Sequence, residues 1–443
     1  MLVNRRHVTA TAQETGTSVL RTKDIDSDAV KVVRKLLTAG HEAYLVGGCV
    51  RDLYVKRRPK DFDVATSATP EEIHKLFRNS RVIGRRFKLV HVYFGPKVIE
   101  TSTFRTAPRQ QEEGEDMLIT HDNEWGSVED DARRRDFTIN ALFFDIETGK
   151  VVDFVDGMDD LDAGVIRTVG VPEVRFREDP VRMIRAIKFA ARLDFSFEPE
   201  TWAALLEVTP DIVKCSRARV LEELYKLLRG GSSRKSFELM LETGLLGHIW
   251  PEYVELYDTH GGLHPRAEDD PDDLPSALLW RHLEALDGYV QQTGQIASNG
   301  VLQAVLYAPL LAGQMLESSR ASLDAAIDKL MHKPSVSLGV ARRDRELARQ
   351  IVMAHRRMTE GGRRRRRSSL VQRQYFHDAL VFLGIWVEAR DKDGAALERW
   401  HTLAASEASR NDGGGDAGGG KRKRRRGGRR RRGKKGGGGG GNG

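Results

Sequence analysis

A stretch near the start of the chain, YLVGGCVRDLYVKRRPKDFDV at residues 44–64, restricts the fold more than any other segment. An apolar, β-prone run ends in Gly47 and Gly48, and a second short strand carries Asp61 and Asp63. Alternate residues of a strand point to one face, so both carboxylates converge while the phenylalanine between them enters the core. We expect this stretch to belong to a small α/β unit, in which the charged groups lie close to backbone that carries no side chains at the two glycines.

The neighbouring segments extend this α/β domain to about residue 156. TPEEIHKLFRN opens with Thr69 as N-cap, a proline at the first helical position and Glu72 three residues after the cap, which is a capping-box pattern. Two β-prone runs follow, KLVHVYFG at residues 88–95 and KVIETSTFR at residues 97–105. An acidic loop containing QQEEGEDM is inserted after them.

From about residue 178 onward the periodicity is almost entirely helical. EDPVRMIRAIKFAARL, RARVLEELYKLL and SSRKSFELMLETGLL repeat apolar residues at helical spacing. The first of these predicts a helix with Asp179 as N-cap and Pro180 at its first position, and with Asp179 and Arg182 paired on one face. An acidic, proline-containing loop interrupts the helices at about residues 266–275, and more helices run to about residue 408.

Positive charge is concentrated at the C-terminal end of the sequence. The net charge is +8, but Lys421–Lys435 alone holds 12 basic residues and no acid, which leaves −4 for all other residues. Residues 409–443 have almost no apolar side chains, so this Gly/Arg-rich basic tail is expected to be disordered and to bind a polyanion. A second block, Arg363–Arg367, precedes a helix-prone aromatic segment and is either part of an RNA-binding region or a solvated charge run.

Cysteine usage and hydropathy exclude several classes of protein. The two cysteines, Cys49 and Cys215, lie far apart, which argues against a disulfide framework and favours a reducing, cytoplasmic compartment. The sequence lacks a run of about 18 apolar residues, so we expect no transmembrane helix. The N-terminal residues lack the apolar segment of a signal peptide, and residues 1–26 are expected to form a flexible arm.

The glycine pair and the acid pair suit a substrate that carries phosphates, together with a metal ion. Glycines let backbone N–H groups approach a phosphate without a Cβ in the way, and Arg51 follows closely enough to add a guanidinium. Asp61 and Asp63 would repel each other unless a cation lay between them. Mg²⁺ is the expected cation, because it takes one or two carboxylates together with phosphate oxygens. A lone glycine pair or a lone acid pair is usually structural, so it is their order within one short stretch that favours this chemistry.

Four segments, LVGGCVRD, KDFDVAT, RRRDFTINALFFD and REDPVRMIRAIKFAARLDF, occur in the order found in one enzyme family. Together they resemble nucleotidyltransferases of the DNA polymerase β superfamily, and more closely the class that contains CCA-adding enzymes and bacterial poly(A) polymerases. The resemblance implies an α+β fold with a polymerase-β-like head built on a small mixed sheet, an all-α body and a disordered basic tail. The expected divisions are a flexible arm at 1–26, a catalytic head at 27–170, a helical region for base recognition and RNA binding at 171–250, a helical C-terminal RNA-binding region at 251–408 and the tail at 409–443.

The resemblance also implies roles for individual residues. It assigns Mg²⁺ binding to the catalytic acids Asp61 and Asp63, and the place of a third catalytic carboxylate to Asp136. Glu100 is a rival for that third place, because its strand should lie beside the acid pair. The implied nucleotide-binding residues are Gly47, Gly48, Arg51, Arg105, Asp179, Arg182 and Arg185.

Within that set, Asp179 and Arg182 are expected to read the base. An aspartate accepts from the exocyclic amino group of adenine or cytosine and an arginine donates to the neighbouring ring nitrogen, whereas guanine and uracil present the reverse pattern. Arg185 is expected near the triphosphate or the ribose. The family usually has a third arginine where this chain has Lys188, so Lys188 is given no role.

Template-independent addition of AMP from ATP to RNA 3′ ends, in mRNA processing and RNA decay, is the activity that the resemblance implies. VIGRRFKLVHVYFG is typical of bacterial poly(A) polymerases, and a CCA-adding enzyme has less need of the Arg-rich tail. Addition of CCA to tRNA is the alternative within the class, since Asp179 and Arg182 accept either A or C. A non-catalytic RNA-binding protein is the alternative outside it, although such a protein would not need intact acid and glycine pairs.

Overall fold

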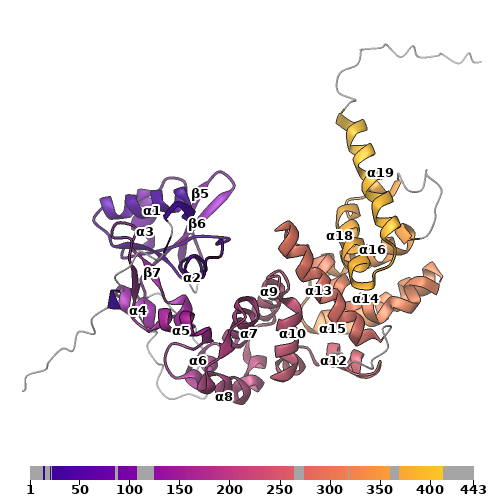
Figure 1. Cartoon of the computed structure of the whole chain (residues 1–443), viewed down its shortest axis with the longest axis horizontal. Helices are drawn as coiled ribbons and strands as arrows, with labels where there is room; N and C mark the ends of the chain where they lie inside the picture. The colour runs from indigo at the N-terminus through magenta and orange to yellow at the C-terminus, as the bar shows by residue number, and fades with distance from the viewer. Residues whose placement is uncertain are drawn as a thin grey trace, which may run out of the picture.

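The computed structural model describes residues 13–14, 20, 22–84, 88–106, 124–263, 274–317, 319–359 and 369–412. Most of the expected arm, the acidic loop at 110–117, most of the loop at 266–275, the Arg363–Arg367 block and residues 413–443 of the expected tail lie outside these residues. Within them, the N-terminal head, a middle group of helices and a C-terminal group of helices follow one another along an extended molecule (Figure 1).

The head is built on one mixed sheet, which confirms the predicted fold class (Figure 1). In the described residues the sheet has eight strands in the order β1-β8-β7-β2-β3-β6-β5-β4, and β3 and β6 are parallel while the other neighbours are antiparallel. The strands are β1 (Gln13–Glu14), β2 (Ala43–Val46), β3 (Asp63–Thr66), β4 (Ser80–Ile83), β5 (Leu89–Phe94), β6 (Lys97–Thr103), β7 (Phe143–Phe144) and β8 (Val151–Asp153). The helical segments of the head are η1 (Thr22–Asp24), α1 (Ser27–Thr38), α2 (Gly48–Tyr54), α3 (Pro70–Leu76), α4 (Val128–Arg133), η2 (Thr138–Asn140) and α5 (Gly157–Ala163).

Helix α1 covers the central strands of the sheet and contacts β2, β3 and β6. Its buried face, Ala29, Val32, Val33 and Leu36, repeats at helical spacing and removes apolar surface from water. The capping box at the start of α3 is confirmed, because the N–H of Thr69 donates to Oε2 of Glu72 at 2.8 Å and the N–H of Glu72 donates to Oγ1 of Thr69 at 3.3 Å.

A short parallel pair, β9 (Val165–Ile166) and β10 (Ser196–Phe197), links the end of the head to the helices that follow. The middle group contains α6 (Pro172–Glu178), α7 (Val181–Leu193), α8 (Pro199–Val208), η3 (Thr209–Lys214), α9 (Arg217–Leu228), α10 (Ser233–Glu242), α11 (Leu245–Ile249) and α12 (Pro251–Asp258). The C-terminal group contains α13 (Pro275–Thr293), α14 (Asn299–Glu317), α15 (Arg320–Ser337), α16 (Arg342–Thr359), α18 (Phe376–Arg390) and α19 (Gly394–Asp412). In the part of the chain that is described, no helix combines the length and the apolar character needed to cross a membrane.

The start of α7 differs from its prediction. Asp179 does not cap α7: it ends α6 with φ −151° and ψ 86°, and Pro180 takes the N-cap position without a side-chain hydrogen bond. A residue before proline is disfavoured in the helical region, which explains the extended backbone at Asp179. The predicted pairing of Asp179 with Arg182 is also wrong, because the Asp179 carboxylate turns instead toward Arg219 of α9.

The C-terminal helices pack around buried aromatic side chains. Trp250 stacks on Tyr253 with ring centroids 4.2 Å apart, and the hydroxyls of Tyr253 and Tyr257 both donate to the carbonyl of Leu306, at 2.9 Å and 3.1 Å. These bonds satisfy polar groups that are fully buried, and they fix α12 against α14. The middle and C-terminal helices therefore share a continuous core.

Candidate active site

Asp61 and Asp63 lie at one end of the central strands of the head. Asp63 is the first residue of β3, in register with Val46 of β2 and with Glu100 of β6. Phe62 is 9% exposed and packs in the core, so the predicted direction of this side chain is confirmed. The structure brings Glu100, the rival for the third carboxylate, directly beside Asp63.

The surroundings of Asp63 suit a divalent cation. Burial, and after it the charges of Asp61 and Glu100, raise the pKa of Asp63 to about 7. Within the described ranges neither Asp61 nor Asp63 forms an ion pair, and no three His, Cys, Asp or Glu side chains are assembled as a metal cluster. Two crowded carboxylates without a cationic partner fit Mg²⁺, which takes one or two protein carboxylates and completes its shell with water and phosphate oxygens.

Gly47 leaves space at the end of β2. Its φ of 75° lies in the left-handed region that favours glycine, and its N–H already donates to the carbonyl of Leu142 at 3.0 Å. A Cβ at this position would lie 3.2 Å from Nη1 of Arg135 and 3.6 Å from the carbonyl oxygen of Asn140. Gly48 follows as the first residue of α2. The lack of a side chain at Gly47 therefore allows the guanidinium of Arg135 to lie close to the backbone at the end of β2.

Arg135 is the main site residue that the sequence reasoning missed. Its Nη2 donates to Oδ2 of Asp131 at 2.8 Å, and its guanidinium lies over the ring of Phe143, 5.2 Å from the centroid. Its charge opposes the rise in the pKa of Asp63, so it lies within electrostatic reach of the acid pair. The only signal in the sequence was the run of three arginines before Asp136.

Arg51 is almost completely buried, with 2% of its surface exposed. Its Nη1 donates to Oδ1 of Asn140 at 2.5 Å and its Nη2 donates to Oδ1 of Asp52 at 2.6 Å, while the guanidinium lies over the ring of Phe189. Burial lowers the pKa of Arg51, and the charge of Asp52 opposes that effect. Arg51 is therefore a hydrogen-bond partner of Asn140 in this structure. Contact between Arg51 and a triphosphate stays a prediction.

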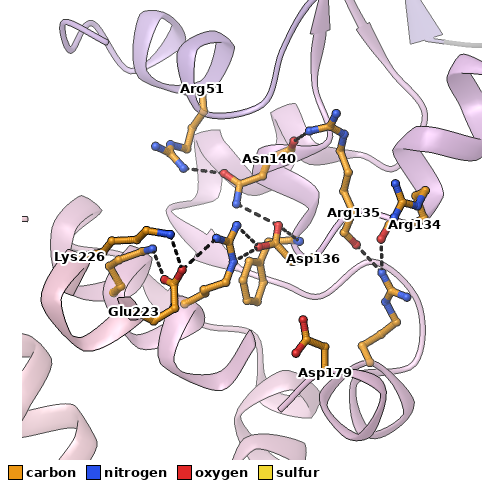
Figure 2. Close-up of polar contacts among 12 residues, drawn as sticks. Arg51, Arg134, Arg135, Asp136, Asn140, Asp179, Glu223 and Lys226 are labelled. Atoms are coloured by element: carbon orange, nitrogen blue, oxygen red, sulfur yellow. Dashed lines mark hydrogen bonds and ion pairs between the residues drawn. The ribbon is translucent and has the colours of Figure 1, made fainter. Parts of the chain in front are cut away.

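Asp136 lies in a network that joins the head to α7 (Figure 2). Its Oδ1 accepts from the N–H of Phe137 at 2.9 Å and from Nδ2 of Asn140 at 3.2 Å. Its Oδ2 accepts from Nε of Arg185 at 2.7 Å and lies 2.6 Å from Nη2 of the same guanidinium. Burial alone would raise the pKa of Asp136, but Arg185 and the hydrogen bond from Asn140 hold it well below its usual range.

Glu223 of α9 continues this network on the far side of Arg185 (Figure 2). Its carboxylate accepts from Nζ of Lys188 at 2.8 Å and from Nζ of Lys226 at 3.0 Å, and lies 3.8 Å from Nη1 of Arg185. Burial would raise the pKa of Glu223, but these cations lower it to about 2. Burial, and then the charge of Arg185, lower the pKa of Lys188 to about 8. Lys188, which was given no role from the sequence, thus holds α7 to α9.

Asp179 has one paired and one unpaired oxygen. Its Oδ2 accepts from Nη2 of Arg219 at 2.7 Å, whereas its Oδ1 is buried and has no partner among the described residues. Arg182 is 9% exposed and donates through Nη1 to the carbonyl of Arg175 at 2.9 Å and to Oε2 of Glu178 at 3.0 Å. The free oxygen of Asp179 is an acceptor that a ligand could satisfy.

Arginines from the head and from α6 and α7 crowd together where these helices meet the head. Burial lowers the pKa of Arg134 to about 9, and four neighbouring guanidinium groups act in the same direction. The members of this arginine cluster are Arg105, Arg134, Arg135, Arg175 and Arg182. The carboxylates of Asp131 and Glu178 pair with part of the cluster. The remaining positive charge suits a ligand with several phosphates.

Three segments of the chain match known protein families. Residues 43–167 match the poly A polymerase head domain, residues 194–256 the probable RNA and SrmB-binding site of polymerase A, and residues 316–434 the arginine-rich C-terminus of polymerase A. Poly(A) polymerase I of Salmonella typhimurium is 37% identical over 370 residues, which cover 81% of this chain and 77% of that protein. The chain belongs to the poly(A) polymerase family. It is a polynucleotide adenylyltransferase, which confirms the reaction class predicted from the sequence.

Other relatives place this member of the poly(A) polymerase family in its wider class. Poly(A) polymerase I of Escherichia coli is 36% identical over 392 residues, covering 85% of this chain and 82% of that protein. A CCA-adding enzyme of Lactobacillus delbrueckii is 41% identical over 226 residues, which cover 51% of this chain and 56% of that enzyme. Among solved structures, the CCA-adding enzyme of Bacillus stearothermophilus in complex with CTP shares a TM-score of 0.60 at 26% identity, covering 85% of this chain and 82% of that one.

The fold separates the predicted site residues into two groups. Asp61 and Asp63 lie at the ends of the head strands with Glu100, while Asp136, Arg185, Asp179 and Arg182 lie where α6, α7 and α9 meet the head. Arg105 closes β6 at a bridge to Trp125, and its Nη2 donates to the carbonyl of Lys88 at 2.6 Å. The arginine cluster connects the two groups.

Proposed function

We propose that this member of the poly(A) polymerase family transfers AMP from ATP to RNA 3′ ends at Asp61 and Asp63. The transfer joins the α-phosphorus of ATP to the RNA 3′-oxygen, breaks the bond to pyrophosphate and releases the hydroxyl proton. The observation that carries the proposal is Asp63, whose pKa is raised by burial and by two neighbouring carboxylates. Enzymes of this family generally use a divalent metal. A bound Mg²⁺ would neutralise phosphate charge and make the attacking hydroxyl more acidic.

We propose that Arg135 and the rest of the arginine cluster hold the triphosphate of ATP. Gly47 permits Arg135 to approach the end of β2, and Arg135 is close enough to Asp63 to affect its pKa. Phosphate oxygens placed between these groups would meet guanidinium donors on one side and the acid pair with its metal on the other. We propose that Gly48 and Arg105 also contact the triphosphate, and that Arg51 supports the site through its hydrogen bond to Asn140.

We propose that Asp179 and Arg182 select the base. Oδ1 of Asp179 is buried and lacks a partner in the described residues, so it can accept from the exocyclic amino group of adenine. Arg182 uses only Nη1 in its two hydrogen bonds, so its other guanidinium N–H groups can donate to the neighbouring ring nitrogen of the base. Arg185 faces Asp136 and Glu223, and its charge lies one helical turn from Arg182, where the ribose and the phosphates would enter.

The third carboxylate can be assigned in two ways. Glu100 is in register with Asp63 and raises its pKa, which favours a part in metal binding. Asp136 is paired with Arg185, which favours a part in holding the nucleotide-binding helix α7. We propose that Asp136 positions Arg185 and that Glu100 adds charge to the metal site.

We propose that three regions of the chain have the separate functions that the sequence suggested. Residues 27–170 form the catalytic head, residues 171–250 recognise the base and contact RNA, and residues 251–408 form a helical RNA-binding region. The matches to a head domain at 43–167, to a probable RNA-binding site at 194–256 and to an arginine-rich C-terminus at 316–434 support this division. RNA 3′ ends, ATP and Mg²⁺ are the proposed partners, substrate and cofactor.

The test is extension of a generic single-stranded RNA with Mg²⁺ and each nucleoside triphosphate separately. We expect long extension with ATP, weaker use of CTP, and little use of GTP or UTP. Asp63→Asn should reduce kcat by more than about a hundredfold, because charge that holds the metal is removed. Asp159→Asn, at an exposed aspartate of α5, is the matched control and should leave kcat unchanged.

Two results would replace the proposal. Extension that is restricted to tRNA and stops after CCA would assign CCA addition, which the relative from Lactobacillus delbrueckii makes the second candidate. RNA binding without incorporation of any nucleotide would assign a non-catalytic role.

A further inference from the structure

A cavity of about 690 Å³ opens on the head on the Asp61 side of the acid pair. The loop between α2 and β3 forms much of its wall, together with residues that precede α1 and the first residues of β6. Asp61 itself lines the cavity. The cationic lining residues are Lys23, Lys56, Arg57, Arg58, Lys60 and Lys97, against the acids Asp24, Asp26 and Asp61.

Cations of the loop between α2 and β3 are available to a ligand, whereas Lys97 of β6 is already paired with acids. Lys97 is neutralised by Asp26 and by Asp28, each at 2.8 Å from its Nζ. Lys56, Arg58 and Lys60 are exposed and form no ion pair with any acid of the described residues. A concave surface that keeps several unpaired cations attracts anions.

The loop is held in shape by contacts that leave these cations free. Pro59 is buried, and Nη1 of Arg57 donates to the carbonyl of Arg192 in α7 at 2.6 Å. Lys56 has a φ of 58°, in the left-handed region that a lysine rarely adopts unless the surrounding structure imposes it. An anion would therefore meet a loop that is already ordered, which reduces the entropic cost of binding.

The two acids of the pair have different neighbours. Gly47 and Arg135, with the arginine cluster, lie on the side of Asp63, where the proposed function places the triphosphate. The cavity with its basic loop lies on the side of Asp61. We propose that residues 56–60 bind backbone phosphates of the RNA strand close to the 3′ end that is extended. This inference rests on the proposed function, and it adds an RNA site on the head to the RNA-binding regions of the helical part.

Binding to backbone phosphates carries no sequence information, so the site would position any RNA strand with its 3′-oxygen toward Asp61.

The test is the triple variant Lys56→Ala/Arg58→Ala/Lys60→Ala in the full chain, titrated with a short fluorescent oligoadenylate in the absence of ATP. We expect affinity for the RNA to fall about tenfold or more at low salt. The slope of log affinity against log salt should become shallower by about 2, at roughly 0.7 for each phosphate of a single strand that the variant no longer neutralises. Steady-state kinetics should show a raised KM for RNA and an unchanged KM for ATP.

A matched control removes the same charge from another face of the head. Lys75→Ala/Arg78→Ala/Arg81→Ala neutralises three exposed cations in and around α3 and β4 and should leave both RNA affinity and its salt slope unchanged. Equal weakening in both variants would overturn the proposal in favour of net charge alone. A raised KM for ATP with unchanged RNA affinity would overturn it in favour of a triphosphate site. Because RNA affinity is measured without catalysis, failure of the wild-type chain to add nucleotides would refute the proposed function without affecting this measurement.

Discussion

Glu100 and Asp136 have the same charge but different surroundings. Glu100 has 54% of its side chain exposed and lies 3.4 Å from Nε2 of His91, whereas the Asp136 side chain is 11% exposed and is bound by Arg185. A carboxylate that is open to solvent beside Asp63 can join a metal shell with little rearrangement. A buried carboxylate in a tight ion pair cannot leave its partner without exposing an unpaired charge.

These surroundings predict different defects for the two substitutions. Glu100→Gln should raise the Mg²⁺ concentration needed for half-maximal activity, with little change in the KM for ATP. Asp136→Asn should cost more activity overall, because it weakens the closest ion pair of Arg185 and so disturbs α7. Metal titrations and ATP titrations of both variants check this. A larger loss in Glu100→Gln than in Asp136→Asn would contradict the part proposed for Asp136 in holding Arg185 and α7.

If Asp179 selects the base as proposed, Arg219 is expected to be a positioning residue, because it holds Oδ2 of Asp179 while Oδ1 has no partner in the described residues. Arg219→Ala removes a hydrogen bond between charged groups, which contributes about 1.5–3 kcal/mol and corresponds to roughly 10- to 100-fold. We expect the preference for ATP over GTP to fall by an amount in that range. Arg217→Ala, at an exposed arginine of the same helix, is the control. An equal fall in kcat/KM for all four nucleotides, with the preference intact, would contradict the role.

At the scale of elements, α13, α16 and α18 enclose two buried histidines. His355 has neither ring nitrogen hydrogen-bonded in the described structure, and its ring lies 4.4 Å from that of Trp386. His282 donates through Nδ1 to the carbonyl of Leu278 at 2.6 Å, and its Nε2 has no partner in the described structure. Burial lowers the pKa of His282 to about 4 and that of His355 to about 3, and the nearby charges of Arg390 and, for His355, His282 add to the effect.

These lowered pKa values predict that the C-terminal helices become less stable in acid. In the unfolded chain each histidine takes up a proton near pH 6.5, whereas in the folded chain it stays neutral down to the lower pKa. The stabilisation is complete above the unfolded pKa and falls as the pH drops toward the folded pKa. Each histidine should cost about 2 kcal/mol of unfolding free energy at about pH 5 relative to about pH 7.

His355→Phe tests this assignment, because phenylalanine fits among Phe382 and Trp386 and has no unsatisfied nitrogen. Thermal unfolding should show a higher Tm for this variant at about pH 5 and a weaker dependence on pH than for the wild type. His248→Phe, at an exposed histidine of α11, should keep the wild-type pH dependence. A variant at 355 that is as sensitive to acid as the wild type would assign the loss of stability to other groups.

At the scale of the whole molecule, charge is divided unevenly along the chain. Lys421–Lys435 carries 12 cations, while all other residues together sum to −4. A long segment of cations binds phosphates without reading sequence, and this binding weakens steeply with salt. Salt titrations of RNA affinity for the full and the truncated chain can therefore distinguish the contribution of the C-terminal end from that of the head.

Deletion of residues 413–443 should reduce the salt dependence of RNA binding. If about six phosphates are neutralised by the tail, log affinity falls with log salt at a slope near −4, so a rise from about 50 to about 200 mM salt weakens binding by roughly several-hundred-fold. The truncated chain should show a flatter slope and a higher KM for RNA, with the KM for ATP nearly unchanged. Salt titrations of RNA affinity for both chains check this. An unchanged slope would assign the tail to solubility or to another polyanion.

Much of the head and of its chemistry could be predicted because the signals are local. The capping box at Thr69, the direction of Phe62 and the order of strand, glycines and acid pair depend on residues only a few positions apart. Their geometry is governed by backbone sterics and by the alternation of side chains along a strand. The helices that follow the head were predicted from the same kind of pattern, whereas the α+β class was implied by the family resemblance.

Only the tertiary structure decided which distant side chains meet. Asp136 and Arg185 are 49 positions apart, and Asp179 and Arg219 are 40 apart. The partner of Asp179 was predicted wrongly because local spacing offered Arg182, while the proline after Asp179 turned its backbone out of the helix. Arg135 stood out in the sequence only as one of three consecutive arginines, and it was the fold that placed its guanidinium beside Gly47 and within electrostatic reach of Asp63. Such contacts depend on sheet register and on helix packing, which a linear pattern of residues does not encode.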